Sequence, residues 1–305
     1  MRAIALGALL ALVGAPALWA VDDPKDKPKT DAPSKITEEV HKITGEYQKE
    51  SSEFYQKNKD KLKEAKTDEE RQKIYDGAPK PAKYVTRLLE LAEKTPKDDP
   101  GALEAVQSAM NFSGNDAEGQ KTRDKALDML IKDFTENEKI GNIATQLVYQ
   151  QSPKAEKLLR AIMEKNPKKE NRGKATYAMA LYLKRTIEMN RELSDPDQAK
   201  EMEKYTSKEA IQAAKEADPA KLEKETKRLF EVVDAKYGDV ELYKNPRTNK
   251  AITLGQKAQG ELFELNNLSV GQTAPEIEHE DLDGKSMKLS EYRGKVVMLD
   301  FWGNW

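Results

Sequence analysis

The stretch YVTRLLELA at residues 84–92 decides the fold class, because its apolar side chains recur every three or four residues. This spacing places them on one face of an α-helix, and such a face needs a partner surface to cover it. The apolar positions are Tyr84, Val85, Leu88, Leu89 and Ala92. The chain is therefore predicted to form helices that pack against one another.

The same spacing continues on both sides of this stretch, over residues 36–266. A long helix is predicted to start at Ile36, and the pair Thr67 and Glu70 forms a capping box that starts another helix. The pair Thr206 and Glu209 predicts a second capping box. We expect residues 36–266 to be one domain of stacked antiparallel helical hairpins.

Two later stretches of this domain resemble each other. AEKLLRAIMEKNP from residue 155 and ETKRLFEVVDAKYGD from residue 225 each carry an apolar helical stripe, a lysine and a Pro or Gly that ends the helix. The pattern resembles the second helix of a tetratricopeptide hairpin. Gly238 is expected to cap the later helix, and a final helix is predicted from Leu254 to Leu265.

The N-terminus has the layout of a secretory signal peptide over residues 1–20. One positive charge at Arg2 precedes an apolar run, small residues follow, and then comes an acidic stretch. Cleavage is expected after Ala17 or after Ala20. We favour this interpretation over a membrane anchor because Gly14 and Pro16 interrupt the apolar run. The mature chain is expected to be exported to the periplasm or another extracytoplasmic space, with no membrane association after cleavage.

Residues 21–35 are predicted to be a disordered linker, since three prolines stand among charges with almost no apolar side chains.

The composition of the whole chain narrows the possible function classes further. The 52 Lys and Arg nearly balance the 54 Asp and Glu and are interspersed with them, so we expect no nucleic-acid partner. The 305 residues include no cysteine, which rules out disulfides and thiol chemistry within them. No pattern indicates a cofactor or a metal site.

The helical spacing ends near residue 270, where the sequence becomes VGQTAPEIEHEDLDGKSMKLSEYRGKVVMLDFWGNW. Pro275 favours an extended start, and Asp283 with Gly284 predicts a turn between two short strands. Ser290 is expected to cap a single helical turn. The apolar run over residues 296–302 then predicts a strand buried on both faces of a sheet.

This order of motifs is similar to the N-terminal part of the alkyl hydroperoxide reductase/thiol-specific antioxidant branch of the thioredoxin-like superfamily. That branch includes the exported TlpA-type thiol-disulfide oxidoreductases. The resemblance covers residues 270–305, and in the family the segment D-F-W-x-x-W leads directly into Cys-x-x-Cys at a helix N-terminus. It therefore implies a thioredoxin-like α/β domain of which these residues hold the N-terminal β-hairpin and the first buried strand. The domain is expected to be incomplete here, with its redox cysteines beyond Trp305.

The resemblance also implies roles for three residues. Asp300 corresponds to the buried acid that accepts a proton during thiol exchange, and Trp302 and Trp305 correspond to the aromatic residues beside the redox centre. The parent protein is expected to act on a protein dithiol or disulfide, or on a peroxide, while this cysteine-free chain is expected to be inactive by itself. The alternative is a non-enzymatic helical module that binds a protein partner and carries a vestigial thioredoxin-like tail.

Overall fold

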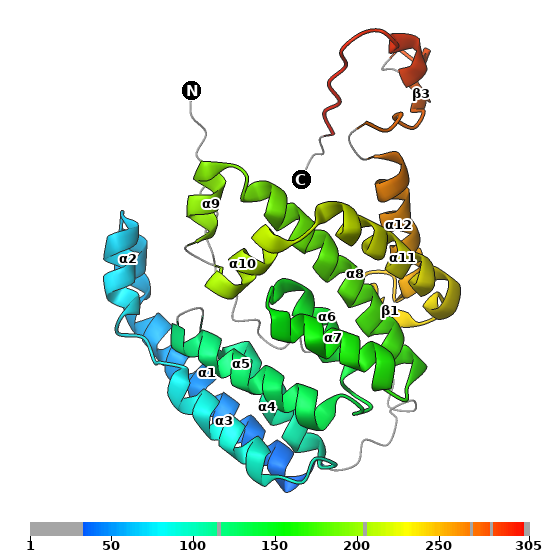
Figure 1. Cartoon of the computed structure of the whole chain (residues 1–305). Coiled ribbons are helices and arrows are strands. Elements are labelled where there is room, and N and C mark those ends of the chain that lie inside the picture. Colours follow the sequence, from blue (N-terminus) through cyan, green and yellow to red (C-terminus); the bar gives the residue numbers. More distant parts are fainter. Residues whose placement is uncertain (1–32, 115–116, 204–205, 269–270, 281–282, 302–305) are drawn as a thin grey trace.

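The computed structural model describes residues 33–114, 117–203, 206–268, 271–280, 283–301. The predicted signal peptide, most of the predicted linker, Trp302 and Trp305 lie outside these ranges. The described chain is mainly helical, with two small antiparallel strand pairs (Figure 1). The predicted fold class, a helical domain followed by a small β portion, is thus confirmed.

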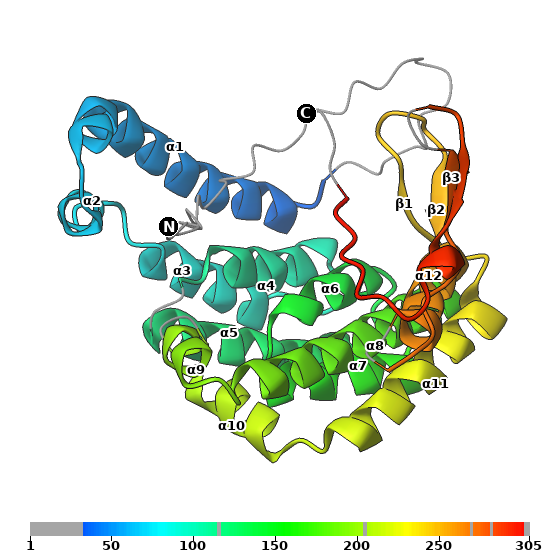
Figure 2. The same ribbon diagram turned by 90° about the horizontal axis from the view of Figure 1, so that it is seen from above.

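The first helices pack into one group at the N-terminal end of the molecule. Helix α1 buries only the start of its length, through Thr37, Val40 and Ile43, and its far half extends away toward α2 (Figure 2). Helices α3 and α4 contact each other and α1, and α5 continues the stack onto α4. The bounds are α1 Lys35–Glu64, α2 Asp68–Tyr75, α3 Ala82–Lys94, α4 Pro100–Phe112 and α5 Ala117–Met129.

The second group of helices is organised around α8 (Lys169–Glu192), which is packed on several sides. Small residues along α8 let its neighbours approach closely: a Cβ atom added at Gly173 would lie 2.9 Å from the Tyr237 side chain. Helices α6, α7, α10 and α11 contact α8. The remaining bounds in this group are η1 Leu130–Phe134, α6 Gly141–Gln146, η2 Leu147–Tyr149, α7 Pro153–Lys165, α9 Pro196–Met202, α10 Lys208–Glu216 and α11 Pro219–Tyr237.

A short hairpin of β1 (Glu241–Lys244) and β2 (Ala251–Thr253) turns the chain from α11 into α12 (Leu254–Asn267). Gly238 ends α11, as predicted, but with φ −59°. Gly255, at the start of α12, packs closely against it, because a Cβ atom on Gly255 would lie only 2.8 Å from the Gly238 Cα. One continuous hydrophobic core then runs from Val40 to Ala258.

Several local predictions can be compared directly with the structure. The Thr67 and Glu70 capping box is present. The predicted box at Thr206 is wrong: Ser207 caps α10, and its hydroxyl accepts from the Ala210 N–H at 3.1 Å. The backbone N–H of Thr206 donates to the Met202 carbonyl, and Ser207, the residue next to α10, has the extended backbone of an N-cap.

Candidate functional site

The C-terminal segment, described from residue 271, contains a hairpin of β3 (Glu278–Glu280) and β4 (Ser286–Lys288). Gly284 provides the turn with φ +77°, a left-handed conformation that glycine adopts without strain. An ion pair between Lys288 Nζ and Glu278 Oε1, 3.0 Å apart, joins the first and last residues of the pair. The predicted turn and hairpin are confirmed, and Figure 1 shows the hairpin beyond the C-terminal end of α12.

Glu276 ties the start of this segment to the short 3₁₀ helix η3 (Leu289–Tyr292) that follows the hairpin. Its Oε1 accepts a hydrogen bond from the Ser290 N–H at 3.0 Å. Hydrogen bonds from the Ser290 hydroxyl and N–H hold the pKa of Glu276 below its usual value. The predicted cap at Ser290 is wrong, because Lys288 holds the N-cap position of η3 and Ser290 lies within the helix.

The run that follows η3 differs from the predicted buried strand. Residues 296–301 form no strand, and the described strands pair only as β1 with β2 and β3 with β4. The side chains of Val296, Met298 and Phe301 are 104%, 91% and 84% exposed. An apolar run becomes a central strand only where neighbouring strands cover it, and the described residues offer none. The prediction of burial is therefore wrong for residues 296–301.

Asp300 lies exposed on this run. Trp302 and Trp305 lie outside the described residues, so the grouping of the three predicted site residues stays a prediction. The sequence provides no thiol for them to serve. Within the described ranges, no three His, Cys, Asp or Glu side chains gather closely enough to hold a metal ion.

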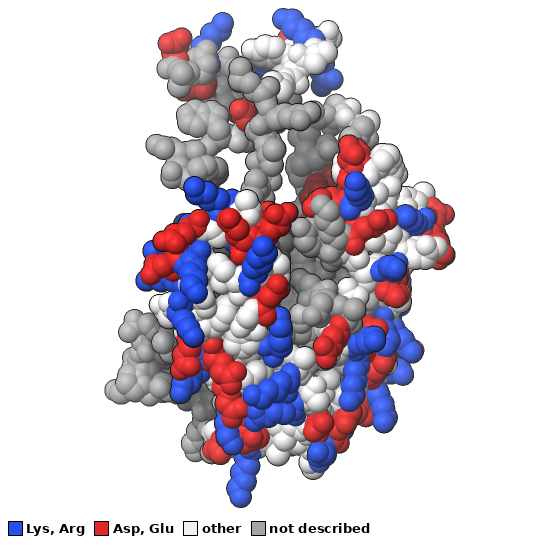
Figure 3. Space-filling model, turned by 90° about the vertical axis from the view of Figure 1, so that its left-hand side faces the viewer, with Lys and Arg blue, Asp and Glu red and all other residues white. Residues whose placement is uncertain are grey.

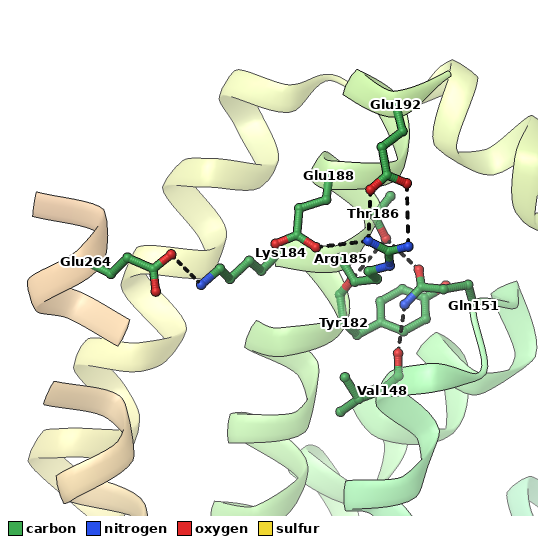
Figure 4. A network of polar contacts seen from close by, with 9 residues as sticks. All are labelled: Val148, Gln151, Tyr182, Lys184, Arg185, Thr186, Glu188, Glu192 and Glu264. Carbon is green, nitrogen blue, oxygen red and sulfur yellow. Dashed lines mark hydrogen bonds and ion pairs between the residues drawn. The ribbon is translucent and has the colours of Figure 1, made fainter. Parts of the chain in front are cut away.

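The best-defined polar network lies instead on α8, where sequence analysis predicted no site (Figure 4). Lys184 Nζ lies 2.8 Å from Glu261 Oε2 and 3.0 Å from Glu264 Oε1, and so joins α8 to α12. Burial would lower the pKa of Lys184, but hydrogen bonds to the two carboxylates outweigh it and raise this pKa. The paired charges hold the last helix in place. Glu261 and Glu264 stand three residues apart, so the sequence alone places both carboxylates on one face of a helix. It does not show that Lys184 is the residue that binds them.

Arg185 lies beside Lys184 and faces the opposite direction in Figure 4, toward Glu188 and Glu192. Its Nη1 lies 3.2 Å from a carboxylate oxygen of each. Across the face of the molecule drawn in Figure 3, Lys and Arg alternate with Asp and Glu. Mixed charges of this kind fit a solvated helical surface.

No helix in the described part of the chain combines the length and the apolar character needed to cross a bilayer. Two pockets in the described structure have volumes of about 400 Å³ and about 140 Å³. The larger is polar and lies where the start of α12 meets the end of α11, and the smaller adjoins Glu276 and Arg293.

The comparisons with known proteins find short matches to thiol-disulfide oxidoreductases. A stretch of 42 residues is 48% identical to the thiol-disulfide oxidoreductase ResA of Geobacillus thermodenitrificans, covering 14% of this chain and 24% of that protein. The ResA of Geobacillus kaustophilus is 50% identical over 42 residues, 14% of this chain and 24% of its own. The ResA of Bacillus subtilis is 46% identical over 39 residues, 13% of this chain and 22% of its own.

These matches are short, and the chain spans about a quarter of the length of the relatives. They support a relationship to thioredoxin-like thiol-disulfide oxidoreductases. No protein-family model matches the chain. No solved structure matches it either.

Proposed function

We propose that this chain is part of an exported thiol-disulfide oxidoreductase, to which it contributes a helical module and the opening of a thioredoxin-like domain. The observation that carries the proposal is the ordered motif of residues 270–305, which ends in DFWGNW. The β3–β4 hairpin and its Gly284 turn fit the start of such a domain. The short, highly identical matches to oxidoreductases support the same chemistry.

The chemistry requires a thiolate, and the motif indicates where it would come from. A cysteine at a helix N-terminus has a lowered pKa, because the helix dipole and free N–H groups stabilise the anion. On our proposal the Cys-x-x-Cys pair follows Trp305, Asp300 accepts a proton from the second thiol, and Trp302 and Trp305 flank the redox centre. The 305 residues themselves contain no cysteine and cannot exchange disulfides.

A protein dithiol or disulfide is the substrate class we favour over a peroxide. The relatives are named for thiol-disulfide exchange, and they match the chain at up to 50% identity over the matched stretch. In that reaction a thiolate attacks a substrate disulfide, one substrate sulfur leaves, and the second thiol of the pair resolves the mixed disulfide.

The test begins with the coding sequence that follows codon 305. An in-frame Cys-x-x-Cys directly after Trp305 is expected, and its absence from the reading frame would contradict the proposal. The extended protein should reduce a protein disulfide in the presence of a dithiol, whereas the 305-residue chain should not. A Cys→Ser variant of the extended protein is the matched control. Asp300→Asn in the extended protein should slow the reaction while leaving both thiols in place.

Export is a second part of the proposal with its own test. Cell fractionation should recover the chain outside the cytoplasm, and N-terminal sequencing should find a mature protein that starts at Leu18 or Val21. A cytoplasmic chain that retains Met1 or Arg2 would contradict export without affecting the redox assignment.

A further inference from the structure

The hairpin of β1 and β2 carries charges of a single sign. Residues 242–260 include Lys244, Arg247, Lys250 and Lys257 but no Asp or Glu. The first three lie in or beside the loop that joins the strands, and all are exposed. On the face drawn in Figure 3, by contrast, both signs alternate. A surface of one sign attracts a partner of the opposite sign.

The loop cations have no carboxylate partner of their own. On α8, Lys169 lies 2.7 Å from an Asp239 oxygen and Lys184 lies 2.8 Å from a carboxylate of α12. Among the described residues, no ion pair of this kind holds the side chains of the three cations of the loop, the tip cluster of residues 244, 247 and 250. The charge of the tip cluster is therefore available to an external partner.

Hydrogen bonds within the loop hold this charge at the end of the hairpin. The Asn245 N–H donates to the Lys250 carbonyl and the Asn249 N–H donates to the Asn245 carbonyl, both at 2.8 Å. Asn245 Oδ1 also accepts from the N–H groups of Arg247 and Thr248. Figure 2 shows the two strands standing clear of the helices. The cations thus occupy a closed, projecting turn.

A projecting tip fits a flat surface better than a peptide. Peptides bind in grooves or along sheet edges, and strands of four and three residues offer a short edge. The larger of the two pockets reaches the hairpin only at Thr253, at the end of β2. Neither pocket includes the tip cluster. The shape of the hairpin therefore favours an extended anionic surface as the partner.

Tyr243, beside the tip cluster, narrows the partner further. Its side chain is 45% exposed, and the Lys257 Nζ lies 5.9 Å from its ring centroid. An aromatic ring with a polar hydroxyl suits the boundary between lipid and water. We propose that this hairpin binds the surface of an anionic lipid bilayer. The tip cluster contacts the headgroup phosphates, and Tyr243 and Lys257 lie at the headgroup level.

This contact is peripheral and needs no apolar span. It revises the expectation that the mature chain has no membrane association, which considered only an apolar anchor. It is also separate from the redox motif, because the C-terminal segment leaves α12 at the end opposite the hairpin (Figure 1). A bilayer bound at the hairpin would hold the helical module at the membrane surface.

Vesicle co-sedimentation tests the proposal with the chain that lacks residues 1–20, which keeps every described residue. Binding should be strong to vesicles of equal parts phosphatidylglycerol and phosphatidylcholine and weak to phosphatidylcholine alone. The neutral vesicles also measure any binding by the apolar side chains of residues 296–301. Binding to the anionic vesicles should fall as salt rises from about 0.05 M to about 0.5 M, since ions screen exposed charges.

Neutralising the tip cluster should weaken binding to the anionic vesicles. Lys244→Gln, Arg247→Gln and Lys250→Gln together should reduce it about a hundredfold, because each cation near such a surface contributes about a factor of five. The matched control removes the same charge at exposed positions of α1, which carries residues 57, 61 and 63. This control, Lys57→Gln, Lys61→Gln and Lys63→Gln together, should leave binding nearly unchanged.

Three results would overturn the proposal. One is equal binding to anionic and neutral vesicles, and another is equal weakening by the two triple variants, which would indicate attraction by net charge. The third is a Glu-rich peptide that binds the natural chain more tightly than the vesicles do and loses affinity when the tip cluster is neutralised. That result would assign the hairpin to an acidic protein segment. None of these measurements involves a thiol, so their failure would not bear on the proposed redox function.

Discussion

The helical module and the C-terminal run both carry apolar side chains that need a partner surface, but their environments are opposite. Leu88, Phe134 and Phe230 are fully buried in the module, whereas Val296 and Phe301 are 104% and 84% exposed. The module covers its apolar faces with its own helices, whose partners lie nearby in the sequence. The run requires neighbouring strands that the described residues do not supply. The apolar pattern therefore indicates which kind of surface must cover a segment. Whether the segment is buried depends on whether the chain supplies that surface.

Two phenylalanines provide the largest expected contrast between these regions. Phe230→Ala should lower the free energy of unfolding by about 3–5 kcal/mol, because it leaves a cavity beside Tyr177, whose ring centroid lies 6.0 Å away. Phe301→Ala should change it by less than about 0.5 kcal/mol, since the ring is already in water. Urea unfolding followed by circular dichroism measures both. Equal effects would mean that Phe301 packs against the module in solution.

Buried polar contacts should produce the next largest effect. Asn166 is 1% exposed, and its Nδ2 donates to the carbonyls of Thr135 and Asn137 at 2.8 and 3.0 Å. Asn166→Ala would leave the Thr135 carbonyl and the Lys168 N–H without their partner, whereas the Asn137 carbonyl would keep the Asn171 amide, so we expect a loss of roughly 3 kcal/mol. Asn266→Ala, at an exposed position of α12, should cost little by the same measurement. A small loss at Asn166 would indicate that water replaces the amide.

The sequence was sufficient for most of the helices because their signals are local. Apolar spacing identified the buried face of α3, and the hydroxyl and carboxylate of Thr67 and Glu70 identified the start of α2. Local signals do not decide between neighbouring hydroxyls. Either Thr206 or Ser207 could cap α10, and only the structure shows that the Ala210 N–H donates to the Ser207 hydroxyl. The repeat relationship between α7 and α11 stays a prediction, although both pack against α8.

Features that depend on distant partners were predicted less well. The β1–β2 hairpin was missed, although its loop carries a turn signal in Asn245, whose Oδ1 accepts from the Arg247 and Thr248 N–H groups. The ion pairs of Lys184 with α12 connect residues about 80 positions apart, beyond the reach of any local pattern. Of the candidate site, the motif could be recognised from the sequence. Whether residues 296–301 are buried could not, since their burial requires neighbouring strands.

A tyrosine buried in the module should make its stability sensitive to alkaline pH. Burial raises the pKa of Tyr177 to about 12 from a usual value of 10.0, so the unfolded chain loses this proton first as pH rises. The stabilisation is complete below about pH 10 and decreases between about pH 10 and 12. At about pH 11 we expect a loss of roughly 1 kcal/mol from this group.

Tyr177→Phe keeps the ring and removes the proton, so it should reduce the alkaline loss measured by urea unfolding at about pH 9 and pH 11. It should not abolish the loss, because burial also raises the pKa of Tyr182. Tyr292→Phe, in η3, is the matched change in the C-terminal segment and should leave the pH dependence unaltered. An unchanged pH dependence in Tyr177→Phe would show that this hydroxyl reaches water.

Removing the C-terminal segment should have the smallest effect on stability and the clearest effect on solubility. The hydrophobic core ends at Ala258, and α12 ends at Asn267, so deletion of residues 270–305 removes no core side chain. The helical circular dichroism signal and the free energy of unfolding should therefore be retained. Solubility should rise, because the exposed apolar run is gone. Deletion of residues 254–305 is the matched control: it also removes Leu254, which is fully buried, and should destabilise the module. If the shorter deletion also lowers the helical signal or the stability, the segment docks on the helices, and the two regions depend on each other for folding.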